Sequence, residues 1–288
     1  MSYAKARDIG FEQIPVIDIA GLVARDPAAS AAAGMAMRKA SERIGFFYVT
    51  GHGLPAATTT QAFTTARRFF DLPKAKKQVL AVNPRHRGWV NPGGAKMYGT
   101  AKPDLKESFV WGLDLPESDP EVVAGTPLMG PNAWPNEVPE LRPALYGWYE
   151  QVMQVGHAVL RGLALSLGRP AEFFTEGYAR PLARGAVIYY PPQPPDLGTD
   201  QFGVAPHTDY GGLTLLAQDM TGGLQVKGSD GGWVMAHPIP DTFVVNIGDL
   251  MHRWTNGRLR SNPHRVVNTS GKARQSCAVF FDPGFHTV

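Results

Sequence analysis

An imidazole and a carboxylate stand two residues apart in this sequence, at His207 and Asp209, just before the apolar run at 213–216. Alternate side chains of a β-strand point to the same face, so this spacing lets both groups face one interior. A third ligand would come from a strand distant in sequence, and His264 in the stretch NPHRVVN is the candidate. Two imidazoles and one carboxylate can hold Fe(II) on one face and leave three coordination positions for a co-substrate and O₂.

The triple alone is a weak signal, because a chain with 8 histidines offers such combinations by chance, and a polar pair at a strand end is the competing interpretation. A second pattern supports the metal site. Arg274 and Ser276 share a strand face, and a guanidinium beside a hydroxyl suits a carboxylate. The tyrosine pair in YYPPQP ends another strand with Tyr190, whose phenol could add a donor. A buried arginine without an anion would be costly, so the pattern implies a bound acid.

The elements that position these residues are short strands, which dominate the chain after residue 180. They are split by turns rich in glycine, as the 32 Gly and 25 Pro of the chain indicate. We expect eight strands, at 185–190, 202–207, 213–216, 223–226, 233–236, 242–247, 265–268 and 275–281. Eight strands match a closed double-sheet jelly roll, which can hold a metal in the barrel mouth.

The first part of the chain shows helical patterns that would buttress the barrel. We expect helices at 35–44, 55–70 and 139–167, a strand at 46–49, and a loop rich in Pro, Gly and Trp over 83–135. The expected fold class is therefore mainly β with α, a double-stranded β-helix core packed against helices. We divide the chain into an N-terminal region (1–120), a scaffold-helix region (121–180) and the jelly-roll core (181–288), which act as one unit.

Composition excludes several other classes of protein. Hydrophobic content of 43% and charged content of 18% are ordinary for a globular chain. The net charge is +3 and the basic residues are scattered, so we expect no nucleic-acid partner. We expect no membrane span and a cytoplasmic location, since no run of about 18 apolar residues and no apolar leader is present. Cys277 in SCAVFF is expected to be a buried structural thiol, and we expect His52, His157, His237 and His252 to be structural.

The ordered motifs YYPPQP, APHTDYGGLTLLAQD, GGLQV, NIGDLMHRWTNGRLRSNPHRVVN and RQSCAVFFDP resemble the 2-oxoglutarate- and Fe(II)-dependent oxygenases of the isopenicillin N synthase-like family. IPVIDIA at 14–20, IGFFYVTGHGL at 44–54 and PDLKESFVWG at 103–112 resemble the N-terminal region of that family. Many plant members carry Asn where this chain has Ile188. The carboxylate of Asp209 counts against halogenation, because halogenating relatives have a small residue there.

The resemblance implies that His207, Asp209 and His264 bind Fe(II), and that Arg274, Ser276 and Tyr190 grip the distal carboxylate of 2-oxoglutarate. It implies an O₂-dependent dioxygenase that oxidises an unactivated C–H bond of a small molecule and releases succinate and CO₂. Hydroxylation is the default outcome, and desaturation or cyclisation needs only a different fate of the substrate radical.

Substrate-facing positions follow partly from strand alternation. Phe280 lies on the same face as Arg274, and Thr214 and Leu216 continue beyond the metal pair. The family likeness adds Tyr210 and Leu224. A loop arginine, Arg87, could meet an acidic substrate. For each of these residues, barrel packing or simple surface exposure is the competing interpretation.

Three other functions stay open on the sequence. A 2-oxoglutarate-independent Fe(II) oxidase of the same family would use Arg-x-Ser for another anion. A non-redox metal-binding jelly-roll protein would need no oxidation chemistry. A hydrolytic zinc site could use the same three ligands but does not call for the Arg–Ser pair.

Overall fold

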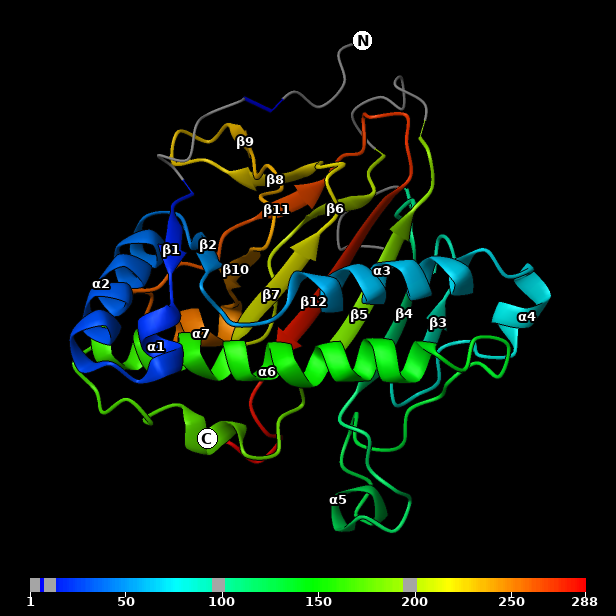
Figure 1. Cartoon of the computed structure of the whole chain (residues 1–288), viewed down its shortest axis with the longest axis horizontal. Helices are drawn as coiled ribbons and strands as arrows, with labels where there is room; N and C mark the ends of the chain where they lie inside the picture. Colours follow the sequence, from blue (N-terminus) through cyan, green and yellow to red (C-terminus); the bar gives the residue numbers. More distant parts are fainter. Residues whose placement is uncertain (1–5, 8–13, 95–101, 194–200) are drawn as a thin grey trace.

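The computed structural model describes residues 6–7, 14–94, 102–193 and 201–288. Two β-sheets pack face to face, and three helices lie across the outer face of the larger sheet (Figure 1). This is the double-stranded β-helix with buttressing helices that the sequence predicts.

The larger sheet carries eight strands. Their order is β1 (Val16–Asp18), β2 (Phe46–Thr50), β10 (Phe243–Ile247), β7 (Leu213–Gln218), β12 (Arg274–Phe281), β5 (Arg184–Tyr190), β4 (Glu107–Gly112) and β3 (Gly88–Val90). The smaller sheet has the order β6 (Val204–His207), β11 (His264–Val266), β8 (Leu224–Lys227) and β9 (Trp233–Met235). Neighbouring strands are antiparallel, except that β1 runs parallel to β2.

The helices lie mostly before the barrel strands in the chain. They are α1 (Ala20–Ala24), α2 (Pro27–Arg43), α3 (Ala56–Phe70), α4 (Lys74–Gln78), α5 (Pro120–Val123), α6 (Leu141–Ser166), the 3₁₀ turn η1 (Thr175–Tyr178) and α7 (Asp249–Trp254). Helix α6 contacts α2, α3, β7 and β12, so it is the element that joins the helical layer to the sheet. Figure 1 shows α3 and α6 crossing in front of the strands.

Strand alternation divides the apolar residues into two cores. On β12, Cys277 and Val279 face the helices and join the core that includes Trp148 of α6. The intervening residues face the other sheet, where Phe280 packs with Leu224 and others. The long strands of the larger sheet are buried on both faces for this reason, and only their inner face is available to a site between the sheets.

The expected loop at 83–135 is wrong as a description of that segment. It contains β3, β4 and α5, and β4 is buried along its whole length. A buried ion pair fixes this part of the sheet, since Lys77 lies 2.8 Å from Glu107, which also accepts a hydrogen bond of 2.6 Å from Trp89 Nε1. The Pro- and Gly-rich composition hid two strands that have little periodicity.

Most expected boundaries differ by one or two residues, and two of the differences matter here. Helix α2 begins at Pro27 and not near residue 35, because Asp26 caps it by accepting a hydrogen bond from the backbone N–H of Ala29 (2.7 Å) and Pro27 suits a first helical position. Strand β11 begins at His264, one residue before the expected start. His264 is therefore a strand residue with a defined face.

The lesser predictions on single residues agree with the structure. Cys277 is fully buried, and burial raises the pKa of its thiol well above the usual range. The ring of His157 packs edge-on against Phe281 at 5.2 Å, and His52 does the same against Phe243 at 4.9 Å. Among the described residues, no helix is both long and apolar enough to cross a membrane.

Candidate metal centre and acid-binding site

His207, Asp209 and His264 meet between the two sheets. His207 ends β6 and His264 begins β11, and the two residues are directly paired in the antiparallel ladder. Nε2 of each imidazole lies close to Oδ1 of Asp209, at 3.6 Å for His207 and 3.8 Å for His264. One ligand atom from each residue lies within 4.8 Å of the other two, and the described residues contain no second group of this kind. The spacing suits one metal ion bound by all three.

Backbone carbonyls orient both imidazoles. Nδ1 of His207 lies 2.8 Å from the carbonyl oxygen of Ala205, and Nδ1 of His264 lies 3.3 Å from that of Asn262. A carbonyl can only accept, so each Nδ1 carries the proton and each Nε2 keeps its lone pair toward Asp209. Burial lowers the pKa of His264 to about 4, against the opposing effect of Asp209. Neutral imidazoles with a free Nε2 are the form that binds metals.

The second oxygen of Asp209 is fully engaged. Oδ2 accepts hydrogen bonds from Thr214 Oγ1 (2.6 Å) and from Asn246 Nδ2 (2.7 Å). Burial alone would raise the pKa of Asp209, but positive charge at His264 and His207, together with the hydrogen bond from Thr214, holds that pKa well below its usual range. The carboxylate is thus ionised and locked, with Oδ1 turned toward His207 and His264.

Arg274 forms a second polar centre on the inner face of the larger sheet. It is fully buried and pairs in register with Tyr190 on β5. Its guanidinium donates to the carbonyl oxygen of Gly222 (2.6 Å), to Ser276 Oγ (3.2 Å) and to Gln218 Oε1 (3.0 Å). The ring of Tyr190 lies 4.7 Å from the guanidinium carbon, so a stacking contact accompanies the hydrogen bonds.

No carboxylate of the described residues lies within ion-pair distance of Arg274, which is unusual for a fully buried guanidinium. All its partners are neutral oxygens. An uncompensated buried charge is costly, and a bound anion would offset that cost. The site is therefore suited to an acid, and the neighbouring hydroxyl of Ser276 supplies a further donor.

Three of the predicted substrate-facing residues lie in the apolar interior between the sheets. Leu224 is buried, and Leu216 and Phe280 are partly buried and pack against the same cluster. All three therefore belong to the apolar interior between the sheets, where the three metal-ligand candidates also meet. Which of them contacts a substrate stays a prediction.

The other three predicted substrate-facing residues lie differently. Thr214 faces the interior, but its hydroxyl is committed to Asp209. Tyr210 is 71% exposed. Arg87, expected on an exposed loop, is buried, and its guanidinium donates to the carbonyl oxygens of Arg85 (3.0 Å) and Leu128 (2.8 Å). Arg87 thus stabilises the backbone of its own region, which overturns the picture of a solvated loop arginine.

Asn246 and Gln218 were not singled out in the sequence. Asn246 is the single polar residue of FVVNI, and Gln218 is, with Thr214, one of two polar residues of LTLLAQ. A polar side chain at an inward position of a buried strand needs a partner, which is the signal that could have identified both.

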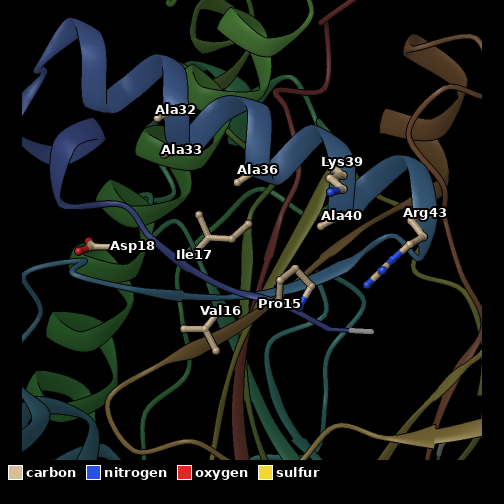
Figure 2. A pocket seen from close by; sticks show the side chains of 10 residues that line it. All are labelled: Pro15, Val16, Ile17, Asp18, Ala32, Ala33, Ala36, Lys39, Ala40 and Arg43. Atoms are coloured by element: carbon tan, nitrogen blue, oxygen red, sulfur yellow. The ribbon is translucent and has the colours of Figure 1, made fainter. Parts of the chain in front are cut away.

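Two surface hollows lie away from these residues. Figure 2 shows one of about 430 Å³ between β1 and α2, where Ile17 and Pro15 face the small side chains Ala33, Ala36 and Ala40. The second, of about 720 Å³, lies between the end of α6 and α7 and includes Trp254. Neither hollow is lined by any of the metal-binding or acid-binding candidates.

Known proteins match this chain along most of its length. Residues 14–137 match the family model for the N-terminal region of non-haem dioxygenases in morphine synthesis, and residues 185–283 match that of the 2OG-Fe(II) oxygenase superfamily. A probable iron/ascorbate oxidoreductase of Dictyostelium discoideum is 34% identical over 99% of this chain and 85% of its own. A 2-oxoglutarate-Fe(II) type oxidoreductase of Emericella nidulans is 36% identical over 93% of this chain and 78% of its own.

Solved structures of similar proteins extend the comparison to ligands. A full-length Neurospora crassa protein, solved in complex with alpha-KG and thymine, superposes with a TM-score of 0.84, at 29% identity over 98% of this chain and 90% of its own. JOX2 in complex with 2OG, Fe and JA superposes with a TM-score of 0.76, at 31% identity over 95% of this chain and 75% of its own.

Proposed function

Since the chain belongs to the 2-oxoglutarate- and Fe(II)-dependent oxygenases, we propose that His207, Asp209 and His264 are the residues that hold its Fe(II). The enzyme is a dioxygenase that uses Fe(II), 2-oxoglutarate and O₂. The donor set supports the assignment, because two neutral imidazoles and an ionised carboxylate are the facial ligands of such iron sites. The carbonyls behind the imidazoles, with Thr214 and Asn246 behind Asp209, would keep the three ligand atoms in place.

The same proposal assigns Arg274 and Ser276 to the distal carboxylate of 2-oxoglutarate. The fit rests on charge: the guanidinium is buried without an anion and is held by Gly222 and Gln218 at a fixed position. Tyr190 would act through its ring, which packs over the guanidinium. When bound, iron and 2-oxoglutarate supply the oxidising chemistry and yield succinate and CO₂. The chain binds, orients and keeps water from the reacting groups.

We further propose that the reaction is oxidation of an unactivated C–H bond of a small molecule, with hydroxylation as the default outcome. The support is the apolar lining that Leu216, Leu224 and Phe280 give to the interior beside the metal ligands. Relatives differ in what they bind, thymine in one complex and JA in another, so no substrate is transferred from them. Desaturation and cyclisation would use the same site.

The three parts of the chain, 1–120, 121–180 and 181–288, are proposed to act as one unit. The larger hydrophobic core supports this, since it combines Phe47 and Phe69 of the first part, Trp148 of the second and Val279 of the third.

The observation that carries the proposal is the coexistence of a three-ligand cluster and a buried arginine without an anion on facing inner surfaces. Anaerobic addition of Fe(II) and 2-oxoglutarate should give a weak visible charge-transfer band in the wild-type protein and none in Asp209→Ala. Screening candidate substrates by succinate release then tests the oxygenase reaction. A band that survives in Asp209→Ala would remove Asp209 from the ligand set, and substrate turnover without succinate would favour the 2-oxoglutarate-independent oxidase.

A further inference from the structure

Arg184 lies in one cross-strand row with the residues that hold Asp209. Arg184 on β5 pairs with Phe280 on β12, Phe280 pairs with Thr214 on β7, and Thr214 pairs with Asn246 on β10. Directly paired residues share a face of the sheet, so all four side chains point to the interior between the sheets. Adjacent strands are about 4.8 Å apart, which places the Arg184 backbone about 10 Å from that of Thr214. Arg184 therefore stands at the rim of the space in front of the metal ligands.

The guanidinium of Arg184 keeps donor capacity unused. Its Nε is buried and has no hydrogen-bond partner among the described residues. Nη1 donates to Nδ1 of His86 at 3.2 Å. The closest carboxylate oxygen, on Asp282, lies 4.0 Å from Nη2 and is too far for a hydrogen bond. The Nε–Nη2 edge, which binds planar acceptors in a two-point contact, thus has no hydrogen-bonded acceptor among the described residues.

Arg87 shows what a structural arginine looks like in the same region. It lies close enough to Arg184 for the two positive charges to oppose each other, which contributes to the lowered pKa of Arg87 after the larger effect of burial. Both terminal nitrogens of Arg87 donate to backbone carbonyls, those of Arg85 and Leu128 among them. Arg184 has no such carbonyl partners within the described part of the chain. Nε of Arg87 is buried without a hydrogen-bond partner like that of Arg184, so the two arginines differ in their terminal nitrogens, and the nearest negative charge to Arg184 is the Asp282 carboxylate at 4.0 Å.

His86 completes a donor pair with Arg184. A guanidinium can only donate, so Nδ1 of His86 accepts and the ring proton lies on Nε2. Burial and the charge of Arg184 lower the pKa of His86, which keeps it neutral in this form. The residue is held at a positive φ of 60°, a conformation that is uncommon for residues other than glycine. Its position is therefore imposed by the fold.

The aromatic ring of Phe280 lies between the guanidinium of Arg184 and the strand that carries Thr214. The guanidinium of Arg184 lies 5.4 Å from the centre of the Phe280 ring, which is only partly buried although it faces the barrel interior. Asp282 borders the same space: its Oδ1 accepts a hydrogen bond from the backbone N–H of Gly212 (3.2 Å), its Oδ2 lies 4.0 Å from Nη2 of Arg184, and burial raises its pKa. A ligand with an acidic end at Arg184 would lay its hydrocarbon part on Phe280, pointing toward Thr214 and Asp209.

We propose that Arg184, supported by His86, anchors the substrate of this enzyme through a carboxylate, and that the substrate is a small organic acid whose oxidised carbon lies across Phe280 from its acid group. This inference rests on the proposed function, because it assigns the acid to the substrate and not to 2-oxoglutarate, which Arg274 would hold. The acid group and the oxidised carbon of the substrate would be several bonds apart, because strand β12 lies between Arg184 on β5 and Thr214 on β7.

The test measures binding of small aromatic and aliphatic carboxylic acids, each paired with its primary amide, by calorimetry under anaerobic conditions. The wild-type enzyme carries Fe(II) and saturating 2-oxoglutarate, so that Arg274 is occupied and cannot take the probes. Wild type, Arg184→Met and Arg184→Lys are compared, with Arg180→Met as the control. Arg180 lies four residues before Arg184 in the chain. Its side chain is half-exposed and forms an ion pair with Asp119 at 2.7 Å.

At least one acid should bind wild type about 10- to 100-fold more tightly than its amide, the range of a charge-assisted hydrogen-bonded pair. Arg184→Met should abolish that preference, Arg184→Lys should keep part of it, and Arg180→Met should leave it intact. A wild-type enzyme for which no acid outbinds its amide overturns the inference, as does a preference that persists in Arg184→Met. The charge-transfer band separates the two failures: without it in wild type the proposed function fails, whereas a normal band without acid preference rejects only the role of Arg184.

Discussion

The hydroxyl of Thr214 donates a 2.6 Å hydrogen bond to Oδ2 of Asp209, the carboxylate oxygen opposite the one nearest the two imidazoles. A side chain expected to contact substrate thus positions Asp209, the proposed carboxylate ligand of the metal. Because Thr214 also lies in the row that ends at Arg184, the same row of strands would serve metal and substrate.

Replacing Thr214 by valine should weaken metal binding without unfolding the protein. Valine keeps the shape of the side chain but leaves Oδ2 with Asn246 as its remaining donor. Loss of such a supporting hydrogen bond typically reduces metal affinity about 10- to 100-fold. Titration with Mn²⁺, followed by thermal stabilisation of the protein, measures the change. Thr64→Val removes an exposed helical hydroxyl as a control, and equal affinities in the two variants would contradict the role of Thr214.

Arg274→Met should abolish the stabilisation that 2-oxoglutarate gives to the metal-loaded protein. The guanidinium is buried among neutral oxygens, so its charge is compensated only when an acid binds. We expect the ligand-induced rise in Tm to disappear in Arg274→Met and to be reduced, but not lost, in Ser276→Ala, which keeps the cation. A Tm shift of normal size in Arg274→Met would place the carboxylate of 2-oxoglutarate elsewhere.

His157 should make the fold less stable as the pH falls. Burial, with Arg161 nearby, lowers its pKa below the ordinary value of 6.5. Below that pH the unfolded chain takes up a proton that the folded chain still refuses, so stability is lost as the pH falls from 6.5 through the folded-state pKa. His157→Met should show a smaller loss of unfolding free energy between about pH 7.5 and 5.5, measured with urea. The exposed His286→Met serves as control, and an unchanged pH dependence in His157→Met would reject this assignment.

Glu107→Gln should strongly destabilise the region that joins β3 to β4. Glu107 and Lys77 are both buried and only 2.8 Å apart, so removing one charge leaves the other uncompensated. Such a loss typically costs about 3–5 kcal/mol of unfolding free energy. Chemical denaturation measures it. Glu117→Gln, which breaks the solvent-exposed pair with Arg85, should leave stability nearly unchanged, and a similar small effect in Glu107→Gln would show that water reaches the buried pair.

Much of the barrel was predictable because its strands alternate. The two-residue spacing of Arg274 and Ser276 predicted their shared face on β12, whereas Asp209 lies two residues beyond the end of β6 at His207, so strand alternation does not account for its position. His264 was the candidate third ligand from the stretch NPHRVVN, and the resemblance to a family implied the same residue. Helix α6 was predictable from its long apolar stripe, from Leu141 to Ser166.

What the sequence missed has physical reasons. Strand β4 is buried on both faces, so it lacks alternation, and its flanking Pro and Gly residues resemble a loop. Helix α2 is rich in alanine, whose small side chains give little periodic contrast. The burial of Arg87 depends on carbonyls of residues far along the chain, such as Leu128, and no local pattern reveals them. Asn246 and Gln218 were overlooked because one or two polar residues hardly change the apolar character of a strand.

Strand β12 carries Arg274 at one end and Phe280 near the other, and it is hydrogen-bonded on both sides by β5 and β7. The distance between Arg274, the proposed anchor of 2-oxoglutarate, and Phe280, a proposed substrate contact, is therefore fixed by six residues of one strand that is paired on both sides. A slip by one residue would turn both side chains to the helical layer at once. Substitutions at Phe280 and its neighbours would then change which substrates fit. The distance between Arg184, the proposed anchor of the substrate's acid group, and the metal-ligand candidates would stay constant.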